Sequence, residues 1–253
     1  MLTKKVALIS DIHSNIEALE AVLSDIDKQG IIDICCLGDI IGYGPNPREV
    51  LRRALQWQFS IRGNHEEGLL YTPFDFNADA IKALDWTRTE LNSEDCSKDE
   101  NFSLWNFLGD LGDIQEENDV MYVHASPRSR TREYIMPFDI KDEDTMRELF
   151  SLVNRLCFCG HTHLPGVFTE DFRFYLPSMV DNVFVPKDGK KFIINIGSVG
   201  QPRDRDLRAS YVVFDGEKIT FHRVEYDYKK TMQKIVDTKK LPLRFAERLA
   251  FGR

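Results

Sequence analysis

Residues that could bind a metal ion recur where apolar, strand-like runs of this sequence end. The run "VALIS" leads into Asp11 and His13 in "SDIHSN", and the run "LCFCG" leads into His161 and His163 in "CGHTH". Comparable positions belong to three further motifs: Asp39 in "LGDIIGYGP", Asn64 and His65 in "RGNHEE", and His124 in "YVHASP". Imidazole nitrogens combined with carboxylate and amide oxygens suit first-row transition ions such as manganese, iron, zinc or nickel.

These residues should converge in space because the carboxyl ends of parallel strands lie at one edge of a sheet. Seven of them are candidate ligands: Asp11, His13, Asp39, Asn64, His124, His161 and His163. A catalytic zinc ion takes three protein ligands, whereas two ions roughly 3.5–4 Å apart that share one carboxylate would use all seven. Any one of these residues alone is more often a turn residue or a helix cap. Five such motifs on one predicted edge favour a centre with two metal ions.

The elements that would position these residues begin with a β-α-β-α-β arrangement over the first sixty residues. The runs "KKVALIS", "IIDICCLG" and "FSIRG" have the aliphatic character of buried strands. Apolar residues recur at helical spacing after Ser14, which forms a capping-box pattern with Glu17. The second helix is expected to have Asn46 as its N-cap and Pro47 at its first position. This alternation predicts a parallel sheet with helices outside it.

The rest of the chain is predicted to be first helical and then rich in strands. From about residue 68 to residue 118 we predict two helices and no clear strand, an insertion that would form a cap over the sheet. The runs "VMYVHA" and "RLCFCG" are predicted strands, with a helix in "KDEDTMRELFSLVN" between them. Five strands follow, with a hairpin turn at Asp215 and Gly216, and two helices close the chain. We predict a single domain over residues 1–253 that includes this cap.

Composition and charge exclude several classes of function. The chain is 42% hydrophobic and has a net charge of −8, and its main body has no basic stripe, which argues against a nucleic-acid partner. Acidic residues concentrate between Glu90 and Asp119, whereas the locally basic tail from Lys229 to Arg253 fits the solvated faces of amphipathic helices. The five cysteines form no C-x-x-C pair, so a thiolate zinc site is not expected and the cysteines should behave as small buried apolar residues.

Nothing in the sequence predicts an association with a membrane. The N-terminal run "MLTKKVALIS" is too short for a signal peptide, and no window is long enough to span a bilayer. We therefore expect a cytoplasmic protein without a membrane partner. The sequence makes no prediction of the oligomeric state.

The ordered motifs "DIHSN", "GDIIGYGP", "GNHE", "VHASP" and "GHTH" resemble those of the calcineurin-like metallophosphoesterase superfamily, over most of the chain. "INIGSVGQPRD" and "AERLAFG" resemble in particular its small bacterial and archaeal phosphodiesterase-type members. The resemblance implies an α/β fold, a four-layer αββα sandwich of two mixed sheets flanked by helices, with two divalent ions, of which manganese is the first expectation. It implies that one ion is held by Asp11, His13, Asp39 and His163. The other would be held by Asp39, Asn64, His124 and His161, with Asp39 as the bridge.

The resemblance also implies that His65 is the catalytic acid rather than a metal ligand. The two cations would convert a bridging water into a hydroxide nucleophile and offset the charge of the phosphate. His65, next to Asn64, would then give a proton to the leaving oxygen, for which an imidazole is well suited. The alternative is a structural role for His65. Glu66 could orient His65, cap a helix or lie at the surface.

Four further residues near these motifs are candidates for binding the substrate: Arg203, Tyr43, Ser126 and Arg128. Arg203 in "GQPRD" could clamp a phosphate in a bidentate way, or pair with Asp204 or Asp206 at the surface. Tyr43 lies in a glycine-rich loop and could stack on a base of the substrate or simply pack. The other two follow the histidine of "VHASP" and could line the pocket.

Three functions are compatible with these motifs. The first is a metal-dependent phosphohydrolase, more specifically a phosphodiesterase with a small phosphorylated substrate. The second is a serine/threonine-type phosphoprotein phosphatase or another phosphomonoesterase, and the third is a non-catalytic protein-binding scaffold. His65 favours an enzyme because a scaffold has no need of it, and the protein phosphatases are expected to carry additional arginines beside the metal motifs. The acidic balance argues against a DNA exonuclease, and the motifs do not identify the physiological substrate.

Overall fold

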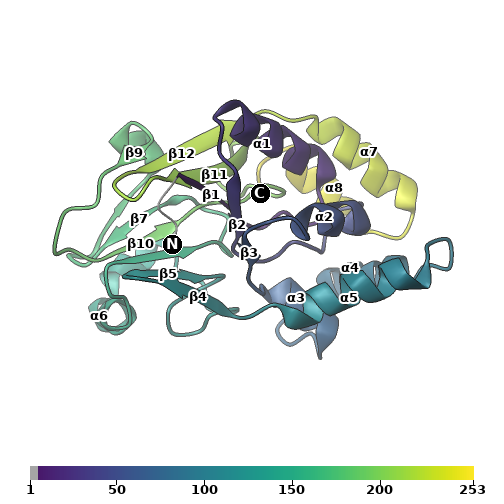
Figure 1. Ribbon diagram of the computed structural model, residues 1–253, viewed down its shortest axis with the longest axis horizontal. Coiled ribbons are helices and arrows are strands. Elements are labelled where there is room, and N and C mark those ends of the chain that lie inside the picture. Colours follow the sequence, from purple (N-terminus) through teal and green to yellow (C-terminus); the bar gives the residue numbers. More distant parts are fainter. Residues whose placement is uncertain (1–4) are drawn as a thin grey trace.

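The computed structural model describes residues 5–253, and its strands form two six-stranded mixed sheets that pack face to face (Figure 1). The strand order of the first sheet is β3-β2-β1-β11-β12-β9. Its strands are β1 (Val6–Ile9), β2 (Asp33–Cys36), β3 (Phe59–Ser60), β9 (Val183–Phe184), β11 (Ala209–Phe214) and β12 (Ile219–Val224). β1, β2 and β3 are mutually parallel, as predicted, and the other neighbours are antiparallel.

The second sheet has the strand order β4-β5-β6-β10-β7-β8. Its strands are β4 (Ile114–Glu117), β5 (Val120–Val123), β6 (Leu156–Cys159), β7 (Gly166–Thr169), β8 (Arg173–Tyr175) and β10 (Phe192–Asn195). β5, β6 and β10 run parallel, and the remaining pairs are antiparallel. The sandwich therefore contains two short parallel blocks, one in each sheet.

The central strands are apolar on both faces, which explains their continuous aliphatic runs. Successive side chains of a strand point to opposite faces of a sheet. In β1, Val6 and Leu8 therefore enter the core between the two sheets, whereas Ala7 and Ile9 enter the core beneath the helices. In β6, Phe158 faces the core between the sheets, and Cys157 packs on the opposite face.

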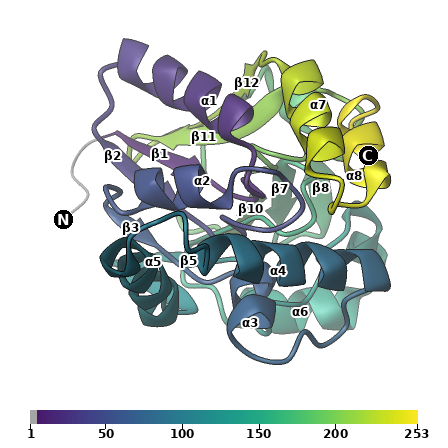
Figure 2. The ribbon, with the colours of Figure 1, turned by 90° about the vertical axis from the view of Figure 1, so that its right-hand side faces the viewer.

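Helices cover both outer faces of the sandwich. The eight α-helices of the described part are α1 (Ile16–Lys28), α2 (Pro47–Ala54), α3 (Asn64–Leu70), α4 (Ala78–Leu91), α5 (Lys98–Asp110), α6 (Glu143–Ser151), α7 (Tyr228–Thr238) and α8 (Leu243–Leu249). α1 and α2 cover the first sheet with α7 beside α1, and α6 covers the second sheet (Figures 1 and 2). This αββα order confirms the predicted fold class.

The segment between residues 68 and 118 differs in part from the prediction. Its two helices are confirmed as α4 and α5, but residues 114–117 form β4, the edge strand of the second sheet, so the expectation of no strand was wrong. The sequence of β4, "IQEE", has one apolar residue and no alternation, and it is a strand because it pairs with β5. Leu84 and Leu104 join the same core as α1 and α2, so these helices extend that core. That the segment acts as a cap over the sheet stays a prediction.

The start of α1 also differs from the prediction. The N-cap is Asn15, whose side chain accepts a hydrogen bond from the backbone N–H of Ala18, rather than Ser14. Ser14 has a φ of 55°, and its backbone N–H donates to the carbonyl of Ile40, so it belongs to the loop that follows β1. Asn46 and Pro47 begin α2 as predicted, and Asp215 accepts backbone hydrogen bonds in the predicted hairpin turn.

The N-terminal run that was judged too short for a signal peptide includes residues 1–4, which lie outside the described residues. Within residues 5–253, no helix has the length and apolar character needed to cross a membrane. The four cysteines in strand-like runs are buried as expected, and Cys96 is half-buried.

Candidate metal centre

The seven candidate ligands meet where parallel strands of both sheets end. Four of them follow strands of the first sheet: Asp11, His13, Asp39 and Asn64. Three follow β5 and β6 of the second sheet: His124, His161 and His163. The expectation of one shared sheet edge is therefore corrected, because the edges of two packed sheets contribute to one place. The aspartate and histidine side chains of this set are at most 4% exposed.

The loops that carry these ligands have an unusual backbone conformation. Five of the seven residues have positive φ: Asp11 (53°), His13 (48°), Asp39 (51°), His161 (64°) and His163 (62°). Residues other than glycine adopt this region at a cost of about 1–3 kcal/mol each, and such strain clusters at functional sites. The loops also approach one another closely, since a Cβ atom on Gly63 would lie 2.2 Å from Oδ1 of Asp39.

Backbone carbonyls determine which nitrogen of each imidazole is free. Each of the four rings has one nitrogen that faces a backbone carbonyl oxygen. In three rings this nitrogen is Nδ1: His13 faces Ile41 at 3.2 Å, His124 faces Leu37 at 2.8 Å, and His163 faces Gln201 at 2.5 Å. In His161 it is Nε2, which lies 3.0 Å from the carbonyl oxygen of Arg132. A carbonyl can only accept, so in the neutral ring the facing nitrogen carries the hydrogen and the other keeps a lone pair. Metal-binding histidines are commonly held in this way.

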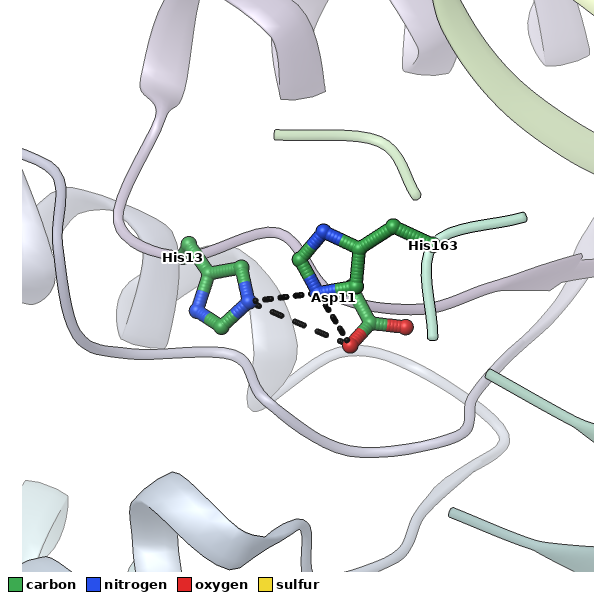
Figure 3. A group of neighbouring side chains, drawn as sticks. All are labelled: Asp11, His13 and His163. Carbon is green, nitrogen blue, oxygen red and sulfur yellow. Dashed lines mark hydrogen bonds and ion pairs between the residues drawn. The ribbon is translucent and has the colours of Figure 1, made fainter. Parts of the chain in front are cut away.

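The first group of ligands consists of Asp11, His13 and His163 (Figure 3). The Nε2 atoms of His13 and His163 face each other at 3.1 Å. Oδ1 of Asp11 lies 3.1 Å from Nε2 of His163 and 3.9 Å from Nε2 of His13, and it is buried with no hydrogen-bond donor within residues 5–253. Two nitrogen lone pairs and an unpartnered carboxylate oxygen at one point fit a cation.

The second group consists of Asp39, His124 and His161, with Asn64 beside them. Nε2 of His124 lies 3.1 Å from Nδ1 of His161, 3.1 Å from Oδ1 of Asn64 and 3.4 Å from Oδ2 of Asp39. The same Oδ2 atom lies 3.7 Å from Nε2 of His13 in the first group. Asp39 therefore faces both groups, and the combined set of nitrogen and oxygen donors could hold two cations.

Burial keeps most of these imidazoles neutral. Burial, and then the charge of His65, lowers the pKa of His13 well below its usual value. Burial, and then the charge of His124, lowers the pKa of His161 to about 3. Each neutral ring retains the lone pair that a metal ligand requires.

The carboxyl groups of Asp11 and Asp39 are held in their charged form by neighbouring histidines. Burial opposes the ionisation of Asp11, but His163 holds the pKa of that carboxyl well below its usual range. Burial likewise opposes the ionisation of Asp39, and His124 outweighs it and lowers the pKa. His124 in turn has its pKa lowered by burial but raised overall, to about 9, by Asp39. A proton on His124 would have to leave when a cation binds there.

Glu66 supports the loops after β2 and β3. Its carboxylate is buried and accepts hydrogen bonds from the backbone N–H groups of Asp39 at 2.9 Å, Ile41 at 3.1 Å and Gly63 at 2.8 Å. Burial, and then the charge of Asp39, raises the pKa of Glu66 to about 7. Of the roles left open for Glu66, the surface position is excluded and the helix-capping contact to Gly63 is present.

His65 lies next to both ligand groups. It is 2% exposed, and Nδ1 has no hydrogen-bond partner among the described residues. Its backbone N–H donates to Oδ1 of Asp39 at 2.9 Å. A ring nitrogen of His65 also lies within 4.8 Å of ligand atoms of His13 and Asp39, so His65 belongs to the same buried polar cluster.

The surroundings of His65 are tightly packed. Its ring centroid lies 4.4 Å from that of Tyr43 and 5.1 Å from that of Phe76. Gly42 has a φ of 94°, and a Cβ atom there would lie 2.0 Å from Nδ1 of His65, so only glycine fits this position. Burial lowers the pKa of His65 to about 4, with Asp39 opposing this change and Arg203 adding to it.

Tyr43 and Arg203 lie close to the ligands. The ring of Tyr43 contacts that of His13 at 4.6 Å and that of Phe245 at 4.7 Å, which favours the packing alternative for this residue. Arg203 donates to Oε1 of Gln201 at 3.0 Å, and its Nε is buried without a partner among the described residues. The suggested surface pair of Arg203 with Asp204 or Asp206 is not formed; those carboxylates pair with other arginines.

The hydrogen bonds and ion pairs that the side chains of Ser126 and Arg128 form are with Ser129, Glu133 and Glu148 rather than with the candidate ligands. Ser126 is buried and donates to the carboxylate of Glu133. The guanidinium of Arg128 pairs with Glu133 and Glu148. Two carboxylates thus already offset the charge of Arg128, which argues against its binding of a phosphate; that Ser126 and Arg128 line the pocket stays a prediction. Tyr134 was not predicted, yet its ring lies 4.0 Å from that of His161, and the loop sequence around it has no periodic pattern that could have indicated this.

Comparisons with known proteins show the family to which the chain belongs. Residues 5–218 match the model of the calcineurin-like phosphoesterase superfamily domain. The chain is 41% identical over 263 residues to an uncharacterised protein of Methanocaldococcus jannaschii, with 100% of both chains covered. A solved metallophosphoesterase from Sphaerobacter thermophilus has 34% identity and a TM-score of 0.81, covering 99% of this chain and 100% of its own. A hypothetical protein from Pyrococcus horikoshii shares the fold, with 21% identity, a TM-score of 0.74 and 98% of both chains covered. The family model spans most of the chain, and this protein therefore belongs to the calcineurin-like phosphoesterase superfamily.

Proposed function

We propose that the protein is a metal-dependent phosphohydrolase, and specifically a phosphodiesterase with two metal ions and a small phosphorylated substrate. One observation carries the proposal: four buried imidazoles each have one nitrogen facing a backbone carbonyl, and their other nitrogens lie among the oxygens of Asp11, Asp39 and Asn64. Membership of the superfamily and the similarity to a solved metallophosphoesterase support it.

In this proposal Asp11, His13 and His163 hold one ion, His124, His161 and Asn64 hold the other, and Asp39 is shared. Two divalent ions bound there would activate a water molecule as the nucleophile and offset the negative charge of the phosphate. The carbonyl partners of the histidines keep the rings oriented, and Glu66 keeps the loop of Asp39 against the loop of Asn64. Such pre-arranged ligands need little reorganisation during the reaction.

His65 is proposed to give a proton to the leaving oxygen. Its low pKa means that the ring is neutral near neutral pH in the free protein. An anionic phosphate bound beside it would bring negative charge, which favours the protonated imidazole and raises this pKa. The position of His65 beside Asp39 and its unpartnered Nδ1 are the observations that support this role.

The test is hydrolysis of matched aryl phosphates by purified protein loaded with manganese. We expect bis(p-nitrophenyl) phosphate to be cleaved and the reaction to be abolished by a chelator. The corresponding monoester is the control for substrate class, since a clear preference for it would indicate a phosphomonoesterase. Protein that contains metal but cleaves neither substrate would indicate a scaffold.

A further inference from the structure

Two arginines, Arg203 and Arg248, have no carboxylate partner in the part of the chain that the structure describes. Arg203 follows Gln201, whose carbonyl oxygen lies 2.5 Å from Nδ1 of His163. Arg248 lies on α8, the last helix of the chain. Within residues 5–253 neither guanidinium forms an ion pair, and the side chain of Arg203 has a single hydrogen bond, to Gln201.

The packing of α8 places Arg248 near the site. Phe245, one helical turn before Arg248, is buried, and its ring contacts that of Tyr43 at 4.7 Å. Leu249, the next residue after Arg248, lines a small cavity together with His13, Tyr43 and Gln201. Arg248 itself, which lies between Phe245 and Leu249 in the sequence, is half-buried.

The end of the chain also holds the loop of Arg203. The backbone N–H of Arg205 donates to the carbonyl of Gly252 at 3.0 Å, and a Cβ atom on Gly252 would lie 2.9 Å from the backbone of Arg205. The C-terminal segment and the loop of Arg203 are therefore in direct contact. Burial, and then the charge of Arg203, lowers the pKa of Arg248.

We propose that Arg248 and Arg203 together bind the negatively charged oxygens of the substrate phosphate beside the metal centre. Two half-buried like charges without a carboxylate repel each other, and an anion between them removes this repulsion. Guanidinium groups match phosphate oxygens in a bidentate way. Arg248 would thus bring the C-terminal helix into the substrate site. This inference rests on the proposed function, and it adds Arg248 to Arg203 as a second arginine of the substrate site.

The test compares Arg248→Gln with Arg205→Gln, which removes the same charge from an exposed position on the loop of Arg203. Binding of inorganic phosphate to manganese-loaded protein is measured by calorimetry, and KM and kcat are measured for the aryl diester. We expect Arg248→Gln to weaken phosphate binding and raise KM by roughly tenfold to a hundredfold, as the loss of a charge-assisted hydrogen bond predicts. The metal content should not change, and Arg205→Gln should have an effect of less than about threefold.

The melting temperature separates binding from a structural role. Arg248→Gln removes a like-charge repulsion, so without phosphate its melting temperature should equal or exceed that of the wild type, whereas a structural arginine would lower it. Arg248→Lys should recover part of the phosphate binding, because the charge remains. Equal phosphate affinity in the Arg248→Gln and Arg205→Gln variants, or no phosphate binding by the wild type, would overturn the inference. Phosphate binding that depends on Arg248 in a protein that cleaves no phosphoester would instead contradict the proposed function alone.

Discussion

At the residue scale, Asp39 is the side chain that connects the two groups of candidate ligands, because its Oδ2 atom faces His13 in one group and His124 in the other. Asp39→Ala should therefore abolish binding of both ions. Asn64→Ala should weaken chiefly the second ion and leave roughly one metal equivalent per chain. Elemental analysis after dialysis against manganese measures both variants. A full metal complement in Asp39→Ala would show that Asp39 is not shared.

His65 separates catalysis from metal binding. His65→Asn should keep the fold and both metals while lowering kcat by about 10²–10⁴, the usual contribution of a general acid. The loss should be smallest for a nitrophenolate leaving group, which departs without a proton, and largest for an alkoxide. A series of diesters with leaving groups of increasing pKa measures this dependence.

The matched control for that variant is His222→Asn, because His222 lies in β12, stacks on Tyr211 and belongs to neither group of candidate ligands. It should leave the activity and its dependence on the leaving group unchanged. Equal losses for all leaving groups in His65→Asn would assign His65 to phosphate binding or positioning, and loss of a metal ion would make it a ligand.

The candidate ligands could be identified from the sequence, but the backbone groups that orient their side chains could not. Asp11, His13 and His163 stand out by type and by their position after apolar runs. The carbonyls that orient the imidazoles, such as those of Ile41 and Leu37, belong to the backbone and leave no trace in residue type. Arg248 follows an ordinary amphipathic helical pattern, so its relation to the site depends on how α8 packs.

At the element scale, the loops after β2 and β3 depend on the buried carboxylate of Glu66. Glu66→Gln would replace one acceptor oxygen by an NH₂ group that faces backbone donors. We expect the free energy of unfolding to fall by about 2–4 kcal/mol, since buried donors would lose their partner. Urea denaturation measures this change. Glu116→Gln, at an exposed position of β4, is the control and should change stability by less than about 0.5 kcal/mol; equal effects in the two variants would argue against the support by Glu66.

Most helices and strands could be predicted from the spacing of apolar residues in the sequence. The exceptions are places where tertiary contacts decide the local structure. β1, β2 and β3 were recognisable because their side chains are buried on both faces of a sheet. β4 was missed because pairing with β5, rather than its own composition, makes it a strand. The cap of α1 was placed one residue too early because Ser14 is held in the turn after β1 by the carbonyl of Ile40.

At the scale of the whole molecule, the site joins the two sheets. Asp11 and Asp39 come from the first sheet, and His124 and His161 come from the second. That two sheets rather than one would contribute could not be read from motif order alone, because every motif follows a strand regardless of the sheet to which the strand belongs.

Metal binding at this junction should stabilise the whole fold. A ligand present at a hundred times its Kd stabilises the native state by about 2.7 kcal/mol, which corresponds to a rise in melting temperature of roughly 5–10 °C for a chain of this size. Treatment with a chelator should lower the melting temperature by at least this amount, and manganese should restore it. Differential scanning calorimetry measures the change, and a melting temperature that does not respond to chelator would argue against bound ions at the junction.

The central claim is that the two ligand groups form a centre with two metal ions. Its most direct test is the metal content of the wild-type protein after dialysis against manganese and removal of free metal, measured by elemental analysis together with the protein concentration. We predict about two equivalents of metal per chain, as two-metal catalysis requires. A value of one equivalent or none would contradict the claim.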